Sequence, residues 1–508
     1  MKAIIGGDMF KKLFFPAFFL FFLSACGGGG TSVSVESGGS SGSSEKVETY
    51  LAYASSIEFV DCNSPGSPVE VVQGKVDDVR VFRRALKVDF SKGTYEGFHY
   101  NYLAFIRDGK VFRLSLLKGK ELPLPREVKG ISDGCSFVEG EGELGSDRGF
   151  VVVETAGSDG DCSGRDDNGE SLVDLSGMRV QELGSKRIVL FLPDSGYRVE
   201  KALFFDLSGN LPLICSLSDV AECSQVQVSG NVFKADFRAG VSVYRYEKKG
   251  FEHFYCIDFG PGAAIYRWNG EELVALPGAP CPGWFTMAAD EEFIYGTDGR
   301  GVFRYRNGVM QELLSSSDLS VDSITGISVL RAGLIVHTVK NLVEKALFYY
   351  EFKSGKVTLI DRPVVEGMVY TGLARDRAFY VKLSDNNTLA ACLWKDSGDK
   401  VCTEGSYWAG YSYLPSGGLN SMAGSVLLYD FSRDVLELTD LDGNVIRVLG
   451  APHLGTEATV SFFGIGSCLL GQMLGKDGNM DIFFVNLDKE NSLVRLTDTP
   501  DRKEMAIF

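Results

Sequence analysis

Oxygen-bearing side chains crowd one glycine-rich stretch of the chain, at positions 157–170. The stretch reads Gly-Ser-Asp-Gly-Asp-Cys-Ser-Gly-Arg-Asp-Asp-Asn-Gly-Glu. Calcium takes about six to eight oxygen ligands, and a glycine lets the backbone turn sharply around the ion. Carboxylates this close together also repel one another when no cation is present. The stretch is therefore a candidate calcium loop, with the candidate ligands Asp159, Asp161, Ser163, Asp167 and Glu170.

The spacing of these residues is similar to that of an EF-hand calcium loop. Counted from Asp159, they fall at positions 1, 3, 5, 9 and 12 of the loop, and Gly164 falls at position 6. Two features depart from that family. Asp166 stands where the family has an aliphatic residue, and the preceding Val-Val-Val-Glu-Thr predicts a strand rather than a helix. We expect either a calcium loop inserted between two strands or an acidic surface loop stapled by Cys162.

The N-terminus has the features of a secretory signal. Lys11 and Lys12 precede an apolar run at 13–23, and small residues follow it. This order of basic, apolar and small residues is typical of a signal peptide. The run is shorter than the roughly 20 residues of a membrane span. We expect residues 1–25 to be removed, with translation beginning at Met1 or Met9.

Leu23-Ser24-Ala25-Cys26 resembles the lipobox of bacterial lipoproteins. The resemblance implies cleavage before Cys26, diacylglycerol on its thiol and a further acyl chain, such as palmitate, on its amine. Several acyl chains hold a protein on a membrane far more firmly than one. Because Gly27 rather than aspartate follows, the resemblance also implies anchoring in the outer membrane of the cell envelope. The alternative is an ordinary signal peptide with a chance cysteine.

The segment after Cys26 is a tether, and the mature chain is acidic. Residues 26–47 are rich in glycine and serine, which predicts a flexible linker. Loss of residues 1–25 removes three lysines and one aspartate, so the net charge of −16 becomes −18. Nucleic acid as a partner is excluded, because phosphates require a basic face.

The cysteine count fits an exported protein. Of eleven cysteines, ten remain once Cys26 is assigned to the lipid, and an even number favours disulfides. The chain has no C-x-x-C, so neither a redox motif nor a zinc knuckle is indicated. Cysteines that flank a hairpin turn lie opposite each other, within bridging distance. The candidate pairs are Cys392–Cys402, Cys215–Cys223 and Cys256–Cys281, while Cys62, Cys135, Cys162 and Cys468 have no predicted partner.

Short apolar runs alternate with Asn-Gly, Ser-Gly and Asp-Gly turns through most of the chain, which is typical of β-hairpins. A repeat of about 40–50 residues built from four short strands is typical of a propeller blade. In the second half of the chain the turn glycines recur at intervals of 38 to 47 residues, at Gly270, Gly308, Gly355, Gly398 and Gly443.

We therefore predict an all-β chain in which residues 48–508 form one β-propeller of four-stranded blades. Turn signals over the whole range give ten units, but single propellers usually have about four to eight blades. We expect seven or eight blades, with some partial units in the first half. A larger propeller or two smaller propellers is the alternative.

The last repeat resembles a TolB-type propeller repeat, also called PD40 and related to WD40. Residues 484–488 read Phe-Val-Asn-Leu-Asp, residues 495–500 read Arg-Leu-Thr-Asp-Thr-Pro, and the chain ends in Met-Ala-Ile-Phe. The S-P-D-G signature of that family is absent. The resemblance covers one repeat well and implies a propeller fold without implying a function.

No catalytic constellation stands out in the sequence. We find no nucleophile triad, Walker loop or dinucleotide fingerprint, and the four histidines are scattered. We therefore expect a lipid-anchored, non-enzymatic propeller that binds envelope or surface proteins, with calcium as its one candidate cofactor. The alternatives are an envelope glycan hydrolase or lyase that uses the propeller funnel, and a calcium-stabilised surface adhesin.

Overall fold

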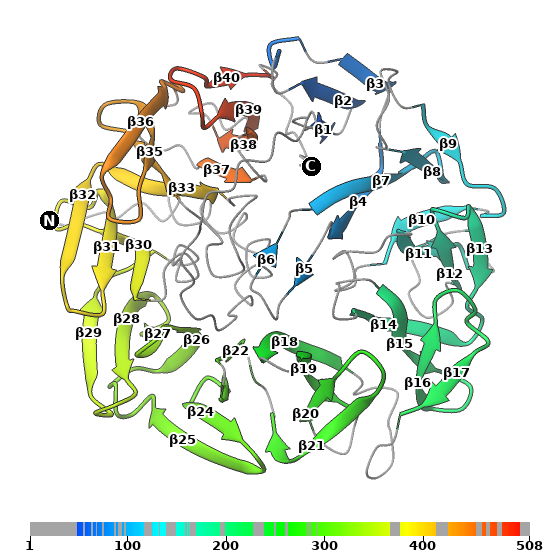
Figure 1. The fold of residues 1–508 in the computed structure, drawn as a ribbon, viewed down its shortest axis with the longest axis horizontal. Helices are drawn as coiled ribbons and strands as arrows, with labels where there is room; N and C mark the ends of the chain where they lie inside the picture. Colours follow the sequence, from blue (N-terminus) through cyan, green and yellow to red (C-terminus); the bar gives the residue numbers. More distant parts are fainter. Residues whose placement is uncertain are drawn as a thin grey trace, which may run out of the picture.

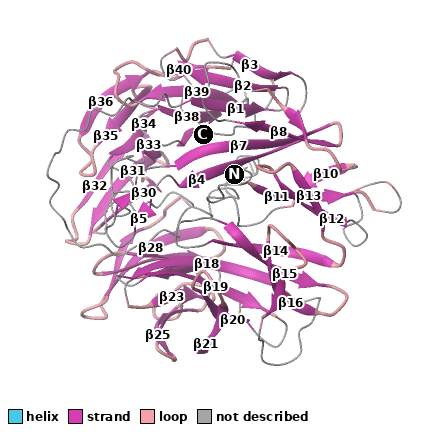
Figure 2. Cartoon of the chain, turned by 45° about the vertical axis from the view of Figure 1, so that its right-hand side comes forward, coloured by secondary structure: helices cyan, strands magenta, loops and turns pink. Residues whose placement is uncertain are grey.

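The computed structural model describes residues 48–53, 56–61, 64–67, 69–73, 76–85, 88–89, 94–95, 98–115, 124–131, 133–138, 149–157, 160, 162, 169–193, 199–226, 238–247, 250–259, 263–281, 284, 286–290, 292–365, 376–412, 425–453, 460–463, 468–474 and 480–497. Every helix or strand assigned in these ranges is a β-strand, so the all-β prediction is confirmed (Figure 2). No helix of the described residues is long and apolar enough to cross a membrane. The predicted signal peptide, Cys26 and the whole linker lie outside these ranges.

Consecutive strands pair as antiparallel meanders. In the first half of the chain the strands are β1 (Glu48–Tyr53), β2 (Ser56–Asp61), β3 (Val69–Gln73), β4 (Asp78–Ala85), β5 (Val88–Asp89), β6 (Thr94–Tyr95), β7 (Phe98–Arg107), β8 (Lys110–Ser115), β9 (Arg126–Glu127), β10 (Gly134–Phe137), β11 (Phe150–Thr155), β12 (Gly169–Asp174), β13 (Arg179–Glu182), β14 (Lys186–Pro193), β15 (Val199–Asp206), β16 (Leu211–Ser216), β17 (Cys223–Gln225), β18 (Arg238–Glu247), β19 (Gly250–Asp258), β20 (Ala263–Trp268) and β21 (Leu273–Pro280).

The second half continues the same pattern. Its strands are β22 (Thr286–Ala289), β23 (Ile294–Thr297), β24 (Gly301–Arg306), β25 (Val309–Ser315), β26 (Ser323–Val329), β27 (Gly333–Lys340), β28 (Glu344–Glu351), β29 (Val357–Asp361), β30 (Arg377–Leu383), β31 (Leu389–Lys395), β32 (Lys400–Glu404), β33 (Ser406–Ser412), β34 (Ser425–Asp430), β35 (Val435–Thr439), β36 (Val445–Gly450), β37 (Val460–Phe463), β38 (Cys468–Leu474), β39 (Met480–Asn486) and β40 (Val494–Arg495).

The meanders follow one another around a single ring, as the blades of a β-propeller do (Figure 1). Within the described residues there are ten of them: β1–β3, β4 with β7–β9, β10–β13, β14–β17, β18–β21, β22–β25, β26–β29, β30–β32, β33–β36 and β37–β40. The last two are linked into one eight-stranded sheet by a parallel pairing of β33 with β37, at Gly410 and Phe462. The prediction of seven or eight blades is therefore not confirmed, whereas the propeller architecture is. The first and last blades lie side by side in the ring (Figure 1).

The middle strands of several blades are apolar on both faces because these blades pack between two neighbours. In β11, Val151 and Val153 join the core shared with the β4–β9 blade. Phe150 and Val152, which alternate with them, join the core shared with the β14–β17 blade. Successive side chains of a strand point to opposite faces, so a strand buried on both faces is a continuous apolar run. The predicted strand Val-Val-Val-Glu-Thr is thus confirmed as part of β11.

The same turn connects consecutive strands in two blades, β12 to β13 and β15 to β16. After β12, the Asp174 carboxylate accepts hydrogen bonds from the Ser176 amide at 2.9 Å and the Ser176 hydroxyl at 2.6 Å. The Asp206 carboxylate does the same for Ser208 after β15, at 3.0 and 2.8 Å. An aspartate that satisfies the backbone two residues further on fixes a tight turn. The Asp-Leu-Ser-Gly sequence is therefore a turn signal of this propeller.

Three disulfides staple individual blades, and they are the three pairs predicted from the sequence. Cys215 faces Cys223 across β16 and β17, and Cys392 faces Cys402 across β31 and β32. Each of these two pairs has its Cα atoms 4.1 Å apart. The third pair, Cys256–Cys281, joins β19 to the residue after β21, with Cα atoms 5.9 Å apart.

Charged side chains tie one blade to the next. Arg377 of β30 forms ion pairs with Asp376 at 2.9 Å and with Asp442 at 2.8 Å. Lys395 of β31 also reaches Asp442, at 2.7 Å. Asp442 lies between β35 and β36, so these contacts cross the boundary between the β30–β32 and β33–β36 blades.

A candidate binding cleft beside the acidic loop

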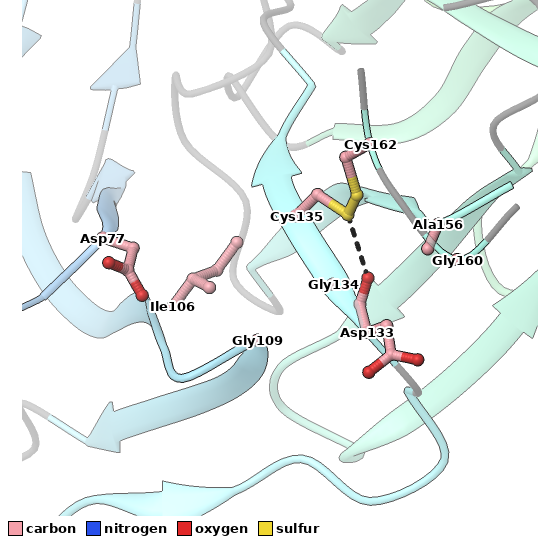
Figure 3. A pocket seen from close by; sticks show the side chains of 9 residues that line it. All are labelled: Asp77, Ile106, Gly109, Asp133, Gly134, Cys135, Ala156, Gly160 and Cys162. Atoms are coloured by element: carbon pink, nitrogen blue, oxygen red, sulfur yellow. Dashed lines mark hydrogen bonds between the residues drawn. A yellow bond between two sulfur atoms is a disulfide. The ribbon is translucent and has the colours of Figure 1, made fainter. Parts of the chain in front are cut away.

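An open cleft of about 320 Å³ lies where the β4–β9 blade meets the β10–β13 blade. Asp77, Ile106 and Gly109 come from the first blade, and the other lining residues come from the second (Figure 3). The cleft adjoins the predicted calcium loop, since two residues of that stretch line it. Its lining residues are Asp77, Ile106, Gly109, Asp133, Gly134, Cys135, Ala156, Gly160 and Cys162.

One wall is a tight hairpin held in place by Asp77. Asp108 and Gly109 join β7 to β8 with φ angles of 50° and 68°. Two successive positive φ angles define a two-residue hairpin turn for which Asp-Gly is a favoured sequence. The Asp77 carboxylate accepts a hydrogen bond from the Asp108 amide at 3.2 Å. A side chain at Gly109 would lie 3.9 Å from the Cα atom of Asp133, so the two blades are in contact here.

The other wall is a β-bulge in β10. The pairing of β10 with β11 shifts register between Gly134 and Ser136, which leaves Cys135 outside the ladder. A bulge redirects the side chain of the extra residue. Cys135 is bonded to Cys162, with the two Cα atoms 5.9 Å apart. This fourth disulfide therefore attaches the segment between β11 and β12 to the bulge, and it pairs two cysteines for which the sequence predicted no partner.

The charge of the cleft is negative. Asp77 and Asp133 are exposed carboxylates, and none of the nine lining residues carries a positive charge. Asp133 adopts φ of 52°, a left-handed conformation that aspartate tolerates better than most residues, and its carbonyl accepts a hydrogen bond from the Ala156 amide at 3.3 Å. A concave surface lined by one sign of charge concentrates ions of the opposite sign. The cleft is suited to a hard cation or to an ammonium or guanidinium group.

The structure describes one of the five predicted calcium ligands, Glu170, which lies at the start of β12. Its carboxylate faces the β14–β17 blade, where it pairs with Arg187 at 3.5 Å and accepts a hydrogen bond from the Ile188 amide at 3.2 Å. Burial raises the pKa of this carboxyl to about 7, against the opposing effects of Ile188 and Arg187. To bind calcium, Glu170 would have to leave these contacts. The other predicted ligands, Asp159, Asp161, Ser163 and Asp167, lie outside the described residues, so the calcium loop stays a prediction.

The histidines are not brought together. His99 lies on β7, His253 on β19 and His337 on β27, while His453 follows β36, so the four occupy different blades. His253 is fully buried beside the Tyr255 ring, and burial holds its pKa well below the usual value. His453 lies 3.0 Å from the Asp434 carboxylate at the surface.

One buried group in the described part of the chain resembles a metal site in its geometry. Ligand atoms of Asp361, Cys392 and Cys402 lie within 4.8 Å of one another. Both sulfurs are already bonded to each other. The Asp361 carboxylate accepts hydrogen bonds from the Tyr380 hydroxyl at 2.9 Å and from Lys400 at 3.1 Å. In this oxidised form the group is an internal ion pair beside a disulfide and offers no thiolate to a metal.

The ring of antiparallel blades defines a β-propeller, and an open cleft lies between two of its blades. No protein-family model matches the chain, and no curated protein matches it either.

The solved structures to which the chain is similar include three proteins with 10% or 11% sequence identity. The tricorn protease is 11% identical with a TM-score of 0.30, over 90% of this chain and 47% of the protease. A puromycin hydrolase variant is 10% identical with a TM-score of 0.30, over 74% of this chain and 63% of the hydrolase. AztD of Citrobacter koseri is 10% identical with a TM-score of 0.32, over 80% of this chain and 95% of AztD.

The chain thus spans about half the length of the tricorn protease and less than two thirds of the puromycin hydrolase. These likenesses transfer no activity, substrate or partner to this chain.

Proposed function

We propose that this protein is a lipid-anchored β-propeller of the cell envelope that binds a protein partner through the acidic cleft. The observation that carries the proposal is the cleft between the β4–β9 and β10–β13 blades, with two exposed carboxylates and no basic side chain among its lining residues. A lysine or arginine of the partner is the group that this surface complements, and charge complementarity chiefly provides specificity and a fast association rate.

The sequence supports the location in the envelope. The basic and apolar signal, the lipobox-like residues before Cys26 and the Gly/Ser linker fit a protein tethered to a membrane by acyl chains. We propose the outer membrane as the compartment because Gly27, rather than aspartate, follows Cys26. The TolB-like last repeat fits a bacterial envelope propeller, and a binding rather than catalytic role fits the sequence, in which we recognised no catalytic motif.

Capture of partners from detergent-solubilised envelope tests the proposal. The bait is the full chain, compared with the double variant Asp77→Asn, Asp133→Asn. Asparagine keeps an oxygen that can accept the Asp108 hydrogen bond, so the hairpin wall is retained while two charges are removed. We expect the wild type to retain a partner that the variant loses, with the loss reproduced in wild type by raising the salt concentration.

The matched control is Glu271→Gln with Glu272→Gln. These exposed residues lie in the turn between β20 and β21, so the change in net charge is the same at a site remote from the cleft. Equal retention by wild type and the cleft variant would contradict the proposed site. Retention of no partner, together with cleavage of an envelope glycan by the purified protein, would favour the enzymatic alternative. Recovery of the wild type in the soluble fraction would contradict the anchor at Cys26.

A calcium-stabilised surface adhesin is the second candidate function. The specific observation in its favour is that Gly160 and Cys162, inside the predicted calcium loop, line the same acidic cleft. The donor chemistry fits, because calcium prefers carboxylate and carbonyl oxygens.

A further inference from the structure

The Cys135–Cys162 disulfide differs from the other three described disulfides in where its sulfurs lie. Cys215 and Cys392 are 0% exposed, and Cys256 and Cys281 are 5% and 0% exposed. Each of those three bonds therefore has at least one cysteine within an apolar interior, in the cores of the β14–β17, β26–β32 and β18–β24 regions. Cys135 and Cys162 are both half-buried, and both line the open cleft (Figure 3).

Position decides how readily a disulfide exchanges with an external thiol. The attacking thiolate needs access to one sulfur, and the other sulfur leaves as a thiolate. Apolar surroundings raise the pKa of a thiol and so make it a poor leaving group. Attack on half-buried Cys223 or Cys402 would expel Cys215 or Cys392 as an anion inside a core. When a thiolate attacks Cys135 or Cys162, the sulfur of the other cysteine leaves as a thiolate that faces the solvent in the cleft.

The pairing of β10 with β11 does not depend on the Cys135–Cys162 bond. Cys135 is the bulged residue, and β10 remains paired with β11 through Gly134–Thr155 and Phe137–Val153. The cross-link is not part of the core that joins the β4–β9 and β10–β13 blades. Cleaving it releases residue 162 from β10 without removing a strand pairing or a core side chain.

We propose that Cys135–Cys162 is a site of thiol–disulfide exchange, which an external dithiol reduces while the buried disulfides of the ring stay intact. A dithiol thiolate attacks one sulfur to form a mixed disulfide and displaces the other cysteine as a thiolate, which takes up a proton. The second thiol of the reagent then attacks the mixed disulfide and releases the first cysteine. The protein gains two electrons and two protons, and the dithiol leaves as its cyclic disulfide. The proposal does not depend on the proposed partner binding.

Differential alkylation of the native full-length chain with dithiothreitol as the probe tests this. Free thiols are blocked first, the protein is then exposed to dithiothreitol for increasing times at pH 8, and new thiols are trapped with iodoacetamide and located by peptide mass spectrometry. We expect Cys135 and Cys162 to be labelled at least about tenfold faster than Cys215, Cys256, Cys281 and Cys392. The circular dichroism of the β-sheet should stay unchanged while they react.

The double variant Cys135→Ser, Cys162→Ser provides the control. It should fold, keep the β-sheet spectrum and lack the fast phase, while its slow phase matches that of wild type. Labelling of the buried pairs at the same rate as Cys135 and Cys162 would overturn the proposal. Loss of sheet structure in step with the labelling, or failure of the double variant to fold, would also overturn it, because the bond would then be part of what holds the ring together.

Discussion

Glu170 shows how a single side chain makes the stability of this propeller depend on pH. Its carboxyl is packed against the β14–β17 blade, beside Arg187 and opposite Glu154 of β11. Burial raises its pKa from 4.5 to about 7. The folded protein therefore holds a proton that the unfolded chain has lost between these two values. The stabilisation from this protonation is complete below pH 4.5 and is lost as pH rises through about 7.

We predict that Glu170→Gln removes this loss of stability. Glutamine stays uncharged and keeps an oxygen to accept the Ile188 hydrogen bond. Because one pKa unit corresponds to about 1.4 kcal/mol, the variant should be more stable than wild type by about 1–3 kcal/mol at pH 8 and nearly equal to it at pH 5. Urea unfolding at the two pH values measures this. Glu182→Gln, at an exposed position of the same blade, is the control and should show no such difference, and equal stabilisation by both variants would refute the assignment to Glu170.

Residue-scale features were predictable where the partners are close in sequence. The Cys392–Cys402 pair could be inferred because both cysteines flank one turn, and the same holds for Cys215–Cys223. Cys135–Cys162 could not, because the bond depends on a bulge that displaces one residue from a ladder. Asp77 and Asp133 were missed as cleft residues for a related reason: they belong to different blades and line one cleft only when the ring forms.

If calcium stabilises this protein, we expect it to do so by binding the segment between β11 and β12. The two strands pair up to Thr155 and Gly169, so the acidic stretch emerges from the end of a hairpin that is otherwise regular. Its carboxylates would repel one another without a cation. A ligand that binds only the folded state stabilises it by about 2.7 kcal/mol when the free ligand concentration is a hundred times the dissociation constant.

We predict that EDTA lowers the melting temperature by about 2 °C or more relative to millimolar calcium, and that Asp161→Asn with Asp167→Asn abolishes the difference. Glu170 is left unchanged in this test, since altering it would disturb the contact with Arg187 for a separate reason. Differential scanning calorimetry with and without EDTA gives the result. The pair Glu271→Gln, Glu272→Gln should keep the full response, and an EDTA-insensitive wild type would exclude the calcium loop.

Strand and turn elements followed closely from local sequence. The predicted Asn307-Gly308 hairpin joins β24 to β25, with positive φ at both residues. The Asp-Leu-Ser-Gly turns of the first half were also predicted, at Ser176-Gly177 and Ser208-Gly209, although the left-handed residue after them is Met178 in one blade and Asn210 in the next rather than glycine. Their common signal is the aspartate, whose carboxylate closes the turn.

The number of blades is the feature of the whole molecule for which the sequence left alternatives open, and the favoured seven or eight blades are not confirmed. Ten turn units were visible, but the usual size of propellers favoured seven or eight blades, and the irregular units of the first half were treated as partial. In the structure those units are complete or nearly complete sheets, including β10–β13 and β14–β17. The hairpin of β5 and β6, inserted between β4 and β7, accounts for some of the irregularity.

A ring in which every blade is covered by two neighbours should tolerate new termini but not a missing blade. The core around β33–β36 uses Phe462, Leu469 and Phe483 of the last blade. Removing residues 451–508 would uncover this core on one side and leave the first blade without its neighbour. At roughly 25 cal/mol for each Å² of apolar surface, exposure of several large side chains exceeds the typical net stability of a domain.

We therefore predict that residues 48–450 alone fail to fold cooperatively, whereas a circular permutant of residues 48–508 does fold. The permutant joins residue 508 to residue 48 through a short Gly/Ser linker and opens the chain between Leu342 and Val343. These side chains, in the turn between β27 and β28, are 88% and 74% exposed, so the cut removes little packing. The permutant should melt in one transition within about 5 °C of residues 48–508 with native termini, while the truncated chain should bind a dye for exposed apolar surface and aggregate. A truncated chain that melted as sharply and at the same temperature would mean that the blades stack as an open array, with no stability gained from closing the ring.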